Sequence, residues 1–426
     1  MLDILFIKKN LSETITSLKK KNFDAEKIIN KLLELDNLRI RLQKKSNLIQ
    51  EKININSKKI GDLYKNNNIN DAKDLKSYGS KLKEDLKEII EKEKKNKIQI
   101  HNILVTVPNI PNSNVPQGKS EKDNQVEKTK TINFISKSND LSHWDLAKKY
   151  DLIDFEKGTV ITGSGFPLYK NKGAVMQRAL INFFLEFNTK LGYSEYIPPL
   201  LVNPESAFGT GNLPDKDGQM YHVEKDDLYL IPTAEVPLTN FHRDEIIDST
   251  ILPLRYTAFT NCFRSEAGAA GKDTKGLMRE HQFGKVELVS ITEPNHSMVE
   301  MERMIECVQM VLKKLELPYR LVELCSTDLG FSSSYTIDLE VWMPGQNKFR
   351  EVSSCSNCKD FQSRRMNMRA KNHSTGEIYY PHTLNGSSIA VGRILISIVE
   401  NYQEENGTIS VPEILKSYMK GKTSIG

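Results

Sequence analysis

The sequence has few cysteines and no long apolar run. Its five cysteines are scattered over 426 residues, and an odd, scattered set favours reduced thiols in a cytosolic protein over a disulfide framework. The opening M-L-D-I-L-F-I-K-K-N holds an apolar run that is too short for a signal peptide or a membrane span. Hydrophobic residues make up 38% and charged residues 27% of the chain, which is typical of soluble proteins, and the length allows two or three domains.

Common nucleotide-binding and metal-binding motifs are missing as well. Neither G-x-x-x-x-G-K-[ST] nor a dinucleotide fingerprint occurs, which excludes a P-loop and a Rossmann turn. Cys355 and Cys358 form a single C-x-x-C, and no second pair or histidine cluster completes the four ligands of a zinc site, so we expect no zinc. The net charge of +5 is too small to indicate nucleic acid by itself.

The N-terminal quarter contains a long helical pattern. Apolar residues recur at alternating steps of four and three up to residue 65, and again after the run Asn66-Asn67-Asn68. The apolar seam positions are Ile28, Leu32, Leu35, Leu42, Ile49, Ile53, Ile60 and Leu63, then Leu75, Leu82, Leu86, Ile89, Ile100 and Ile103. Such a heptad pattern with a short turn predicts an antiparallel coiled-coil hairpin, with arms roughly 50 Å long.

Lysines are frequent on the outer faces of this predicted hairpin, for example Lys44, Lys58, Lys83 and Lys94. A projecting basic arm is suited to contacting phosphates. Two other interpretations stay open. The lysines could belong to a solvated face that also carries glutamates, or the hairpin could serve oligomerisation, which polar seam residues such as Asn56 would weaken.

Pro108, Pro111 and Pro116 end the second helical run and mark a boundary. We therefore predict a helical arm over residues 1–107 and a second domain over residues 108–426. Residues 120–131 are expected to be an exposed linker. Further along, we expect helices at 173–191 and 298–315, strands at 334–343 and 349–353, a strand with Pro198-Pro199, and a last helix that begins near residue 386. This mixture predicts an α+β domain on an antiparallel sheet.

The most informative stretch runs from residue 259 to 288. Residues 256–263 and 283–289 have the composition of strands, and a Gly- and Lys-rich segment joins them. That connection is longer than a plain hairpin needs, which indicates a functional loop. We expect the charged residues around it to lie on the strands beneath a polar ligand; a solvated edge hairpin is the alternative. These residues are Arg264, Glu266, Arg279, Glu280 and Glu287.

The string F-R-S-E, followed by the Gly/Lys loop and R-E-H-Q-F, resembles motif 2 of the class II aminoacyl-tRNA synthetases. T-A-E-V-P-L-T-N and H-T-L-N-G-S-S-I-A-V-G-R resemble the bacterial-type seryl-tRNA synthetase family in particular. The helix at 173–191 with Pro198-Pro199 resembles motif 1, which implies a homodimer. The resemblance covers nearly the whole chain. It implies a cytoplasmic ligase that joins serine to tRNA(Ser), and also to tRNA(Sec) in hosts that make it, with the basic arm on the tRNA's long variable arm.

The resemblance also implies an ATP site with Mg²⁺. In it Arg264 and Arg393 are catalytic and hold the α- and γ-phosphates, Phe283 stacks on adenine, and Glu266 lies near the adenine amino group. Arginine suits this work because its planar fork binds phosphate oxygens bidentately. Glu351 and Ser354 would reach ATP through the metal, whose preferred ligands are oxygens. The full set is Arg264, Ser265, Glu266, Arg279, Phe283, Glu351, Val352, Ser353, Ser354 and Arg393.

The serine contacts implied by the resemblance are Thr233, Ala234, Glu235, Glu287, Asn385 and Ser387. Carboxylates can bind the ammonium group, and a site that bonds the substrate hydroxyl rejects alanine because its polar groups would be left unpaired. The sequence departs from the family pattern at Ser388, where glycine is usual, and at Gly165, where arginine is expected. Both departures affect the expected substrate geometry and leave the phosphate-binding arginines intact.

Two other functions fit parts of the sequence. A related ligase could charge a carrier protein, but such a protein would not need the long basic arm. A non-catalytic tRNA-binding or scaffold protein would not need Arg264, Glu266, Glu351 and Arg393 together. Removing the arm distinguishes these cases, because a synthetase without it should still form adenylate and lose tRNA charging.

Overall fold

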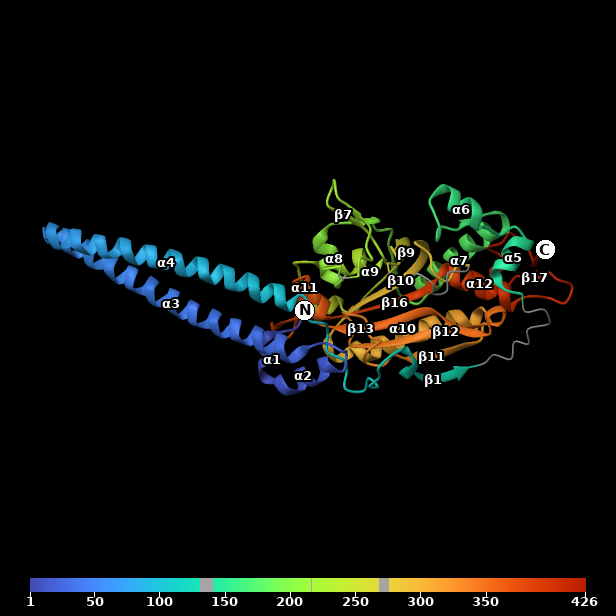
Figure 1. Ribbon diagram of the computed structural model, residues 1–426, viewed down its shortest axis with the longest axis horizontal. Coiled ribbons are helices and arrows are strands. Elements are labelled where there is room, and N and C mark those ends of the chain that lie inside the picture. The colour runs from blue at the N-terminus through green and yellow to red at the C-terminus, as the bar shows by residue number, and fades with distance from the viewer. Residues whose placement is uncertain (131–140, 216, 268–275) are drawn as a thin grey trace. The chain divides into compact units, whose positions relative to one another are not determined.

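The computed structural model describes residues 1–130, 141–215, 217–267 and 276–426 (Figure 1). It contains two compact units, Leu2–Pro108 and Asn109–Gly426 together with Met1. Most of the Gly/Lys segment of the predicted motif 2, from Gly268 to Lys275, lies outside the described residues. Among the described helices, none has the length and apolar character needed to cross a membrane.

The Leu2–Pro108 unit is helical. Two short helices, α1 (Ile4–Lys9) and α2 (Leu11–Lys19), precede the long helices α3 (Ala25–Lys65) and α4 (Ile69–Leu104), which run side by side as the predicted hairpin (Figure 1). Ile49, Ile53, Leu82 and Ile89 form its apolar seam, which confirms most of the heptad assignment. Near the base, Ile29 is fully buried in place of the predicted Ile28.

The second unit is built on an antiparallel sheet, as the sequence predicts. Within the described residues the strand order is β1-β11-β12-β13-β16-β10-β9-β4, and only the β4–β9 pair is parallel. The strands are β1 (Gln125–Lys130), β11 (Tyr319–Glu323), β12 (Tyr335–Met343), β13 (Lys348–Lys359), β16 (His382–Ala390), β10 (Gln282–Thr292), β9 (Leu254–Phe263) and β4 (Ser194–Glu195).

Three helices, α7 (Asn171–Lys190), α10 (Ser297–Lys314) and α12 (Val391–Asn401), share one apolar core with this sheet. From β10, Val286 and Leu288 enter that core. Side chains alternate along a strand, so Lys285 and Glu287 face the opposite side of the sheet. The sheet therefore separates an apolar face under helices from a polar face that can bind a ligand.

Shorter helices and strands complete this unit. The helices are α5 (His143–Lys149), α6 (Phe155–Ile161), α8 (Pro204–Thr210), α9 (Glu235–Thr239) and α11 (Phe361–Arg365). The strands are β2 (Ile153–Asp154), β3 (Leu168–Tyr169), β5 (Leu201–Val202), β6 (His222–Val223), β7 (Leu228–Leu230), β8 (Ile246–Asp248), β14 (Arg369–Lys371), β15 (Ile378–Tyr379), β17 (Ile409–Ser410) and β18 (Ser424–Ile425).

Three local predictions are wrong. Residues 382–390 form strand β16, and the last helix begins at Val391, because the alternating apolar residues there pair with β10 and β13. The expected linker at 120–131 contains β1, which pairs with β11. The strand expected near Pro198-Pro199 is split into β4 and β5, since prolines cannot donate to a sheet ladder.

Candidate active site

The site lies at the end of the sheet where β9 finishes and β10 starts. Their last sheet pair is Phe263 with Gln282, so the charged residues that we expected on the strands, except Glu287, lie just beyond them. The backbone turns at Glu266, which has a left-handed φ of 50°, an uncommon conformation for a residue with a side chain. This turn brings Glu266 Oε2 to 2.9 Å from Arg279 Nη1. The ion pair joins the segment that follows β9 (residues 264–267) to the segment that precedes β10 (residues 276–281), here called the first and second limbs of motif 2.

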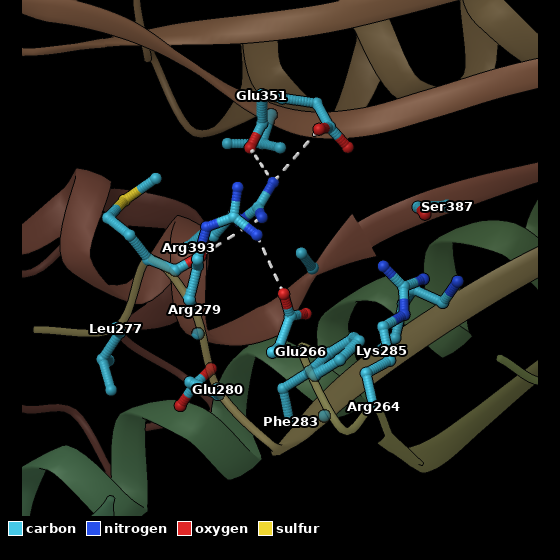
Figure 2. Close-up of a pocket in the computed structure, with 15 residues that line it drawn as sticks. Arg264, Glu266, Leu277, Arg279, Glu280, Phe283, Lys285, Glu351, Ser387 and Arg393 are labelled. Carbon is cyan, nitrogen blue, oxygen red and sulfur yellow. Dashed lines mark hydrogen bonds and ion pairs between the residues drawn. The ribbon is translucent and has the colours of Figure 1, made fainter. Parts of the chain in front are cut away.

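A pocket that is partly open to solvent lies between these limbs and the neighbouring strands (Figure 2). The lining residues come from motif 2, β13, β16 and α12: Arg264, Glu266, Leu277, Met278, Arg279, Glu280, Phe283, Gly284, Lys285, Glu351, Val352, Ser387, Ala390, Gly392 and Arg393. It thus collects eight of the residues implied by the resemblance.

Arg264 and Phe283 form one wall of the pocket. The Arg264 guanidinium carbon lies 5.2 Å from the centre of the Phe283 ring, within the range of a cation–π contact, and Nε donates to the Pro232 carbonyl at 3.4 Å. The flat aromatic ring offers a stacking surface for a nucleotide base. The guanidinium beside it offers a positive charge for a phosphate.

Arg393 lies opposite, near the N-terminus of α12. Its Nη1 donates to the Glu351 carbonyl at 2.8 Å and lies 3.4 Å from Glu351 Oε2, and its Nη2 donates to the Met278 carbonyl at 3.3 Å (Figure 2). These contacts connect β13, α12 and the second limb of motif 2. They hold the positively charged guanidinium of Arg393 in place at the pocket wall.

The sequence grouped Glu280 only with the charged residues expected beneath a polar ligand; in the structure it is buried in the pocket wall. Burial raises the pKa of Glu280 to about 8, although the Tyr169 hydroxyl, 3.2 Å away, and the Arg393 charge both oppose this shift. A carboxyl in this state is largely protonated below neutral pH. Tyr169 comes from β3, more than a hundred residues earlier, and no local pattern links the two residues.

A bulge in β13 explains how Glu351 and Ser354, three residues apart, can share one side of the sheet. Glu351 pairs with Glu340 and Ser354 pairs with Asp338, with a register shift between. Asp338 and Glu340 are two residues apart on β12 and share a face, so their partners share it too. Burial and the Glu351 charge raise the pKa of Asp338, while a hydrogen bond to Ser354 opposes the rise.

The oxygens of Glu351 and Ser354 are the candidate ligands for a magnesium ion. Among the described residues, no group of three or more His, Cys, Asp or Glu side chains has the geometry of a metal site. Magnesium in phosphate-transfer sites usually takes only one or two protein carboxylates and completes its shell with substrate phosphates and water. Glu351, at the pocket wall, and Ser354, on the same face, fit that sparse requirement.

Next to the pocket lies a buried polar cluster that holds four of the six predicted serine contacts, Thr233, Glu235, Glu287 and Asn385. Lys285 Nζ lies 2.6 Å from Glu287 Oε2 and donates to Thr233 Oγ1 at 2.8 Å, and Thr233 Oγ1 donates to Glu287 at 3.1 Å. Sequence reasoning missed Lys285. The available signal was its position two residues before Glu287, since alternate residues of a strand share a face.

Glu235 forms the other half of the cluster. It accepts hydrogen bonds from Asn385 Nδ2 at 2.9 Å and from Gln362 Nε2 at 2.7 Å. Burial and the nearby Glu287 charge raise the pKa of Glu235 to about 7. Gln362 lies on α11 and was not predicted, because nothing local in the sequence connects it with Glu235.

The remaining predicted residues do not line the pocket. Ser265 Oγ donates to the Gly218 carbonyl, and Ser353 Oγ donates to the Ser387 carbonyl. Ala234 is fully buried in an apolar cluster behind the site. Ser354 lies on the same face of β13 as Glu351 and outside the pocket lining.

Both departures from the family pattern have a structural setting. Gly165 has a φ of 81°, and an added Cβ would meet His281 Cδ2 at 2.4 Å, so a larger residue would have to displace the ring. Ser388 is buried and donates to Asn188 Oδ1 at 3.1 Å. Asn188 lies on α7, so the Ser388 side chain points into the helical face and away from the pocket.

Comparisons with known proteins agree with this geometry. The sequence model of the "tRNA synthetase class II core domain (G, H, P, S and T)" matches residues 220–402, and that of the "Seryl-tRNA synthetase N-terminal domain" matches residues 1–111. Serine–tRNA ligase from Mesoplasma florum is 44% identical over 425 residues, covering 100% of both chains. The enzyme of the same name from Staphylococcus haemolyticus is 44% identical over 432 residues, with 100% of this chain and 99% of the relative covered.

Solved structures show the same similarity. Seryl-tRNA synthetase from Pyrococcus horikoshii complexed with ATP superposes with a TM-score of 0.93 at 34% identity, covering 100% of this chain and 99% of the other. Cytoplasmic serine–tRNA ligase from Naegleria fowleri in complex with AMP gives 0.88 at 31%, covering 100% and 98%. The chain belongs to the seryl-tRNA synthetase family, the serine–tRNA ligases among the class II aminoacyl-tRNA synthetases.

Proposed function

We propose that this chain activates L-serine with ATP and transfers the serine to the 3′ end of tRNA(Ser), and of tRNA(Sec) in hosts that make it. In the first step a serine carboxylate oxygen attacks the α-phosphorus, the bond to the bridging oxygen of the β-phosphate breaks, and diphosphate leaves. In the second step the terminal ribose hydroxyl of the tRNA attacks the seryl carbonyl, its proton passes to a phosphate oxygen of the adenylate, and AMP leaves. The observation that carries the proposal is the joining of a cationic pocket to a buried polar cluster through Arg264 and Lys285.

The assigned roles follow from charge and position. Arg264 would stabilise the extra negative charge on the α-phosphate, and Arg393 would bind the γ-phosphate, since guanidinium groups pair bidentately with phosphate oxygens. Phe283 would stack on adenine. We assign no general base. In the first step the carboxylate nucleophile carries no proton at neutral pH, in the second the leaving phosphate takes the hydroxyl proton, and catalysis rests on positioning and electrostatics.

Glu351 and Ser354 would hold Mg²⁺, which would supply positive charge between phosphate oxygens when bound. Support comes from the β13 bulge, which gives both oxygens one face. Ser265, Val352 and Ser353 would act as backbone or supporting contacts, because their side chains do not point a free polar group into the pocket.

In the serine cluster, Glu235 and Glu287 would receive the ammonium group, and Thr233, Asn385 and Ser387 would contact the polar atoms of serine. Two carboxyl groups in one buried cluster favour a cationic ligand, because burying a charge without a partner is costly. Lys285 offsets one of these charges.

We assign residues 1–107 to tRNA binding and residues 108–426 to catalysis in a cytoplasmic homodimer. Basic residues on the outer surface of α3 and α4 support the first assignment. For the dimer, support comes from the segment after α7, where Ile197 is 91% exposed beside Tyr196 and Leu201, both 41% exposed. Exposed apolar groups of this kind are typical of protein interfaces.

Exchange of labelled diphosphate into ATP, with each standard amino acid and without tRNA, tests the proposal. We expect exchange with serine alone. Exchange with another amino acid would overturn the roles of Glu287 and Ser387, and no exchange with any would favour a non-catalytic tRNA-binding protein. A chain without residues 25–104 should keep serine-dependent exchange and lose tRNA charging; full charging would contradict the arm's role.

A further inference from the structure

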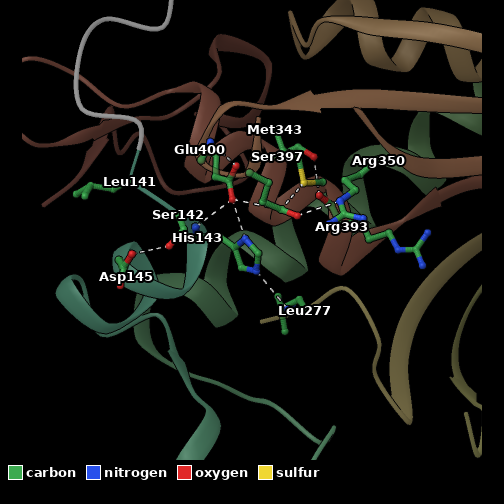
Figure 3. Close-up of polar contacts among 12 residues, drawn as sticks. Leu141, Ser142, His143, Asp145, Leu277, Met343, Arg350, Arg393, Ser397 and Glu400 are labelled. Atoms are coloured by element: carbon green, nitrogen blue, oxygen red, sulfur yellow. Dashed lines mark hydrogen bonds and ion pairs between the residues drawn. The ribbon is translucent and has the colours of Figure 1, made fainter. Parts of the chain in front are cut away.

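A buried histidine and glutamate lie behind the motif 2 limb, outside the pocket. His143 opens α5 and Glu400 lies near the end of α12; their side chains are 1% and 0% exposed. His143 Nδ1 is 2.7 Å from Glu400 Oε1, and the His143 backbone N–H donates to the same oxygen at 3.0 Å (Figure 3). The mechanism above uses neither residue.

The hydrogen-bond partners determine where the imidazole carries its proton. Glu400 accepts from the backbone N–H of Gly345 at 3.0 Å and from that of His143 at 3.0 Å. Two N–H donors on its two oxygens favour an ionised carboxylate, which can only accept, so we assign the proton of the ring contact to His143 Nδ1. On the other side of the ring, the Leu277 backbone N–H donates to His143 Nε2 at 3.3 Å (Figure 3). Only a ring nitrogen without a proton can accept a hydrogen bond from an N–H group. The network therefore assigns a neutral imidazole with its proton on Nδ1.

The ring also packs directly against the limb's backbone. Gly276 has a φ of 73°, and an added Cβ there would meet His143 Nε2 at 1.9 Å. Two residues further on, the Met278 carbonyl accepts from Arg393 Nη2 at 3.3 Å, and Arg279 pairs with Glu266. The contacts thus run in sequence from Glu400 through His143 and the 276–278 backbone to Arg393.

We propose that His143, oriented by Glu400, is a positioning residue for the nucleotide site. It fixes the backbone of residues 276–278 and, through the Met278 carbonyl and the adjoining Arg279, the two arginines that line the second side of the pocket. This inference rests on the proposed ATP site. A purely structural role is the alternative, in which the pair only stabilises the contact of α5 with α12.

His143→Leu tests the proposal, with Asn401→Leu as its matched control. Asn401 is also buried on α12, and its Nδ2 donates to the Trp342 carbonyl at 2.9 Å and to the Ser397 carbonyl at 2.8 Å, neither of which belongs to motif 2. In serine-dependent exchange we expect His143→Leu to lower kcat/KM for ATP about tenfold, the factor set by about 1.4 kcal/mol, while KM for serine stays within about twofold. Asn401→Leu should lose comparable thermal stability and keep both kinetic constants near wild type.

If both variants lose the same stability and show the same kinetics, the positioning role is wrong. His143→Gln should recover part of the lost kcat/KM, since a carboxamide offers both a donor and an acceptor; a glutamine variant no better than the leucine variant would also contradict the assigned contacts.

A measurement on the unmodified protein covers the case in which the leucine variant does not fold. Nitrogen NMR of the full chain labelled at histidine, with His143→Gln for assignment, should show His143 protonated on Nδ1 alone. A proton on Nε2 would remove the acceptor for Leu277 and overturn the proposal. This result does not depend on activity, whereas loss of wild-type exchange with serine would instead refute the proposed function.

Discussion

Lys285 and Glu287 form a buried ion pair two residues apart on one strand, with Nζ 2.6 Å from Oε2. Thr233 donates to the same carboxylate and accepts from the same ammonium group. The three side chains thus form hydrogen bonds and an ion pair with one another, and they present an oriented carboxylate to the proposed serine site. Breaking a buried pair on one side is far more harmful than removing both partners, because it leaves an uncompensated charge.

Lys285→Met should therefore weaken serine binding. The methionine has a similar length and leaves Glu287 buried without its cation, so we expect unfolding stability to fall by about 3 kcal/mol. Because Lys285 also holds Glu287 and Thr233 in place, its loss should disturb their orientation and raise KM for serine at least about tenfold. Exchange kinetics at varied serine and denaturant unfolding measure the two effects. The double variant Lys285→Met with Glu287→Leu should regain part of the stability but not the serine affinity; an unchanged KM in Lys285→Met would contradict the role.

Arg264→Ala should abolish adenylate formation while the protein stays folded. Loss of one preorganised donor to a developing charge typically lowers kcat by about 10²- to 10³-fold. Arg320→Ala is the control, because Arg320 also lies over a phenylalanine ring, Phe349, at 4.5 Å, but outside the pocket lining. Normal exchange in Arg264→Ala, or an equal loss in Arg320→Ala, would argue against the assignment.

The raised pKa of Glu280, about 8 against an ordinary value of 4.5, predicts a pH-dependent stability. Between these two values the unfolded carboxyl loses its proton while the folded one keeps it, so the unfolded state binds fewer protons. The contribution of Glu280 to stability should then be fully present below about pH 4.5 and be lost as pH rises towards 8, by up to about 1.4 kcal/mol per pH unit.

Glu280→Gln removes this titration and keeps the shape of the side chain. Urea unfolding at several pH values between 5 and 8.5 should show the variant gaining stability over wild type as pH rises. Parallel curves for the two proteins would mean that Glu280 is ionised in the folded state.

Gly79→Ala should destabilise the hairpin of α3 and α4. Alanine normally stabilises a helix by about 0.5–1 kcal/mol over glycine, but here the added Cβ would meet Asn56 Nδ2 at 2.7 Å and disturb its 2.8 Å hydrogen bond to the Leu75 carbonyl. Gly61→Ala is the matched control, because nothing lies within 4 Å of its Cβ, and it should be stabilising.

Amide hydrogen exchange of α3 and α4 in the full chain reads the local stability of this hairpin. We expect faster exchange in Gly79→Ala and slower exchange in Gly61→Ala. Serine-dependent ATP exchange should be unchanged in both variants, and tRNA charging should fall only in Gly79→Ala. Equal protection in the two variants would show that Asn56 moves aside without cost.

Much of the architecture is predictable from local pattern. The heptads predict the long hairpin because burial in a two-helix seam depends only on positions three and four residues apart. The strands on both sides of motif 2 are predictable for a similar reason, since alternation identifies a half-buried strand. The pattern failed at residues 382–390, where apolar residues suit either a helix or a strand, and pairing with β10 and β13 selected the strand.

By itself the sequence determined the arm, the class of the sheet domain and, through its motifs, the family. Only the tertiary structure decided which residues meet. Glu280 with Tyr169, Glu235 with Gln362, and His143 with Glu400 are each more than a hundred residues apart, and the β13 bulge that puts Glu351 and Ser354 on one face depends on pairing with β12. The physical reason is that propensity and periodicity act over a few residues, whereas burial, proton positions and pKa values depend on neighbours that folding brings from distant parts of the chain.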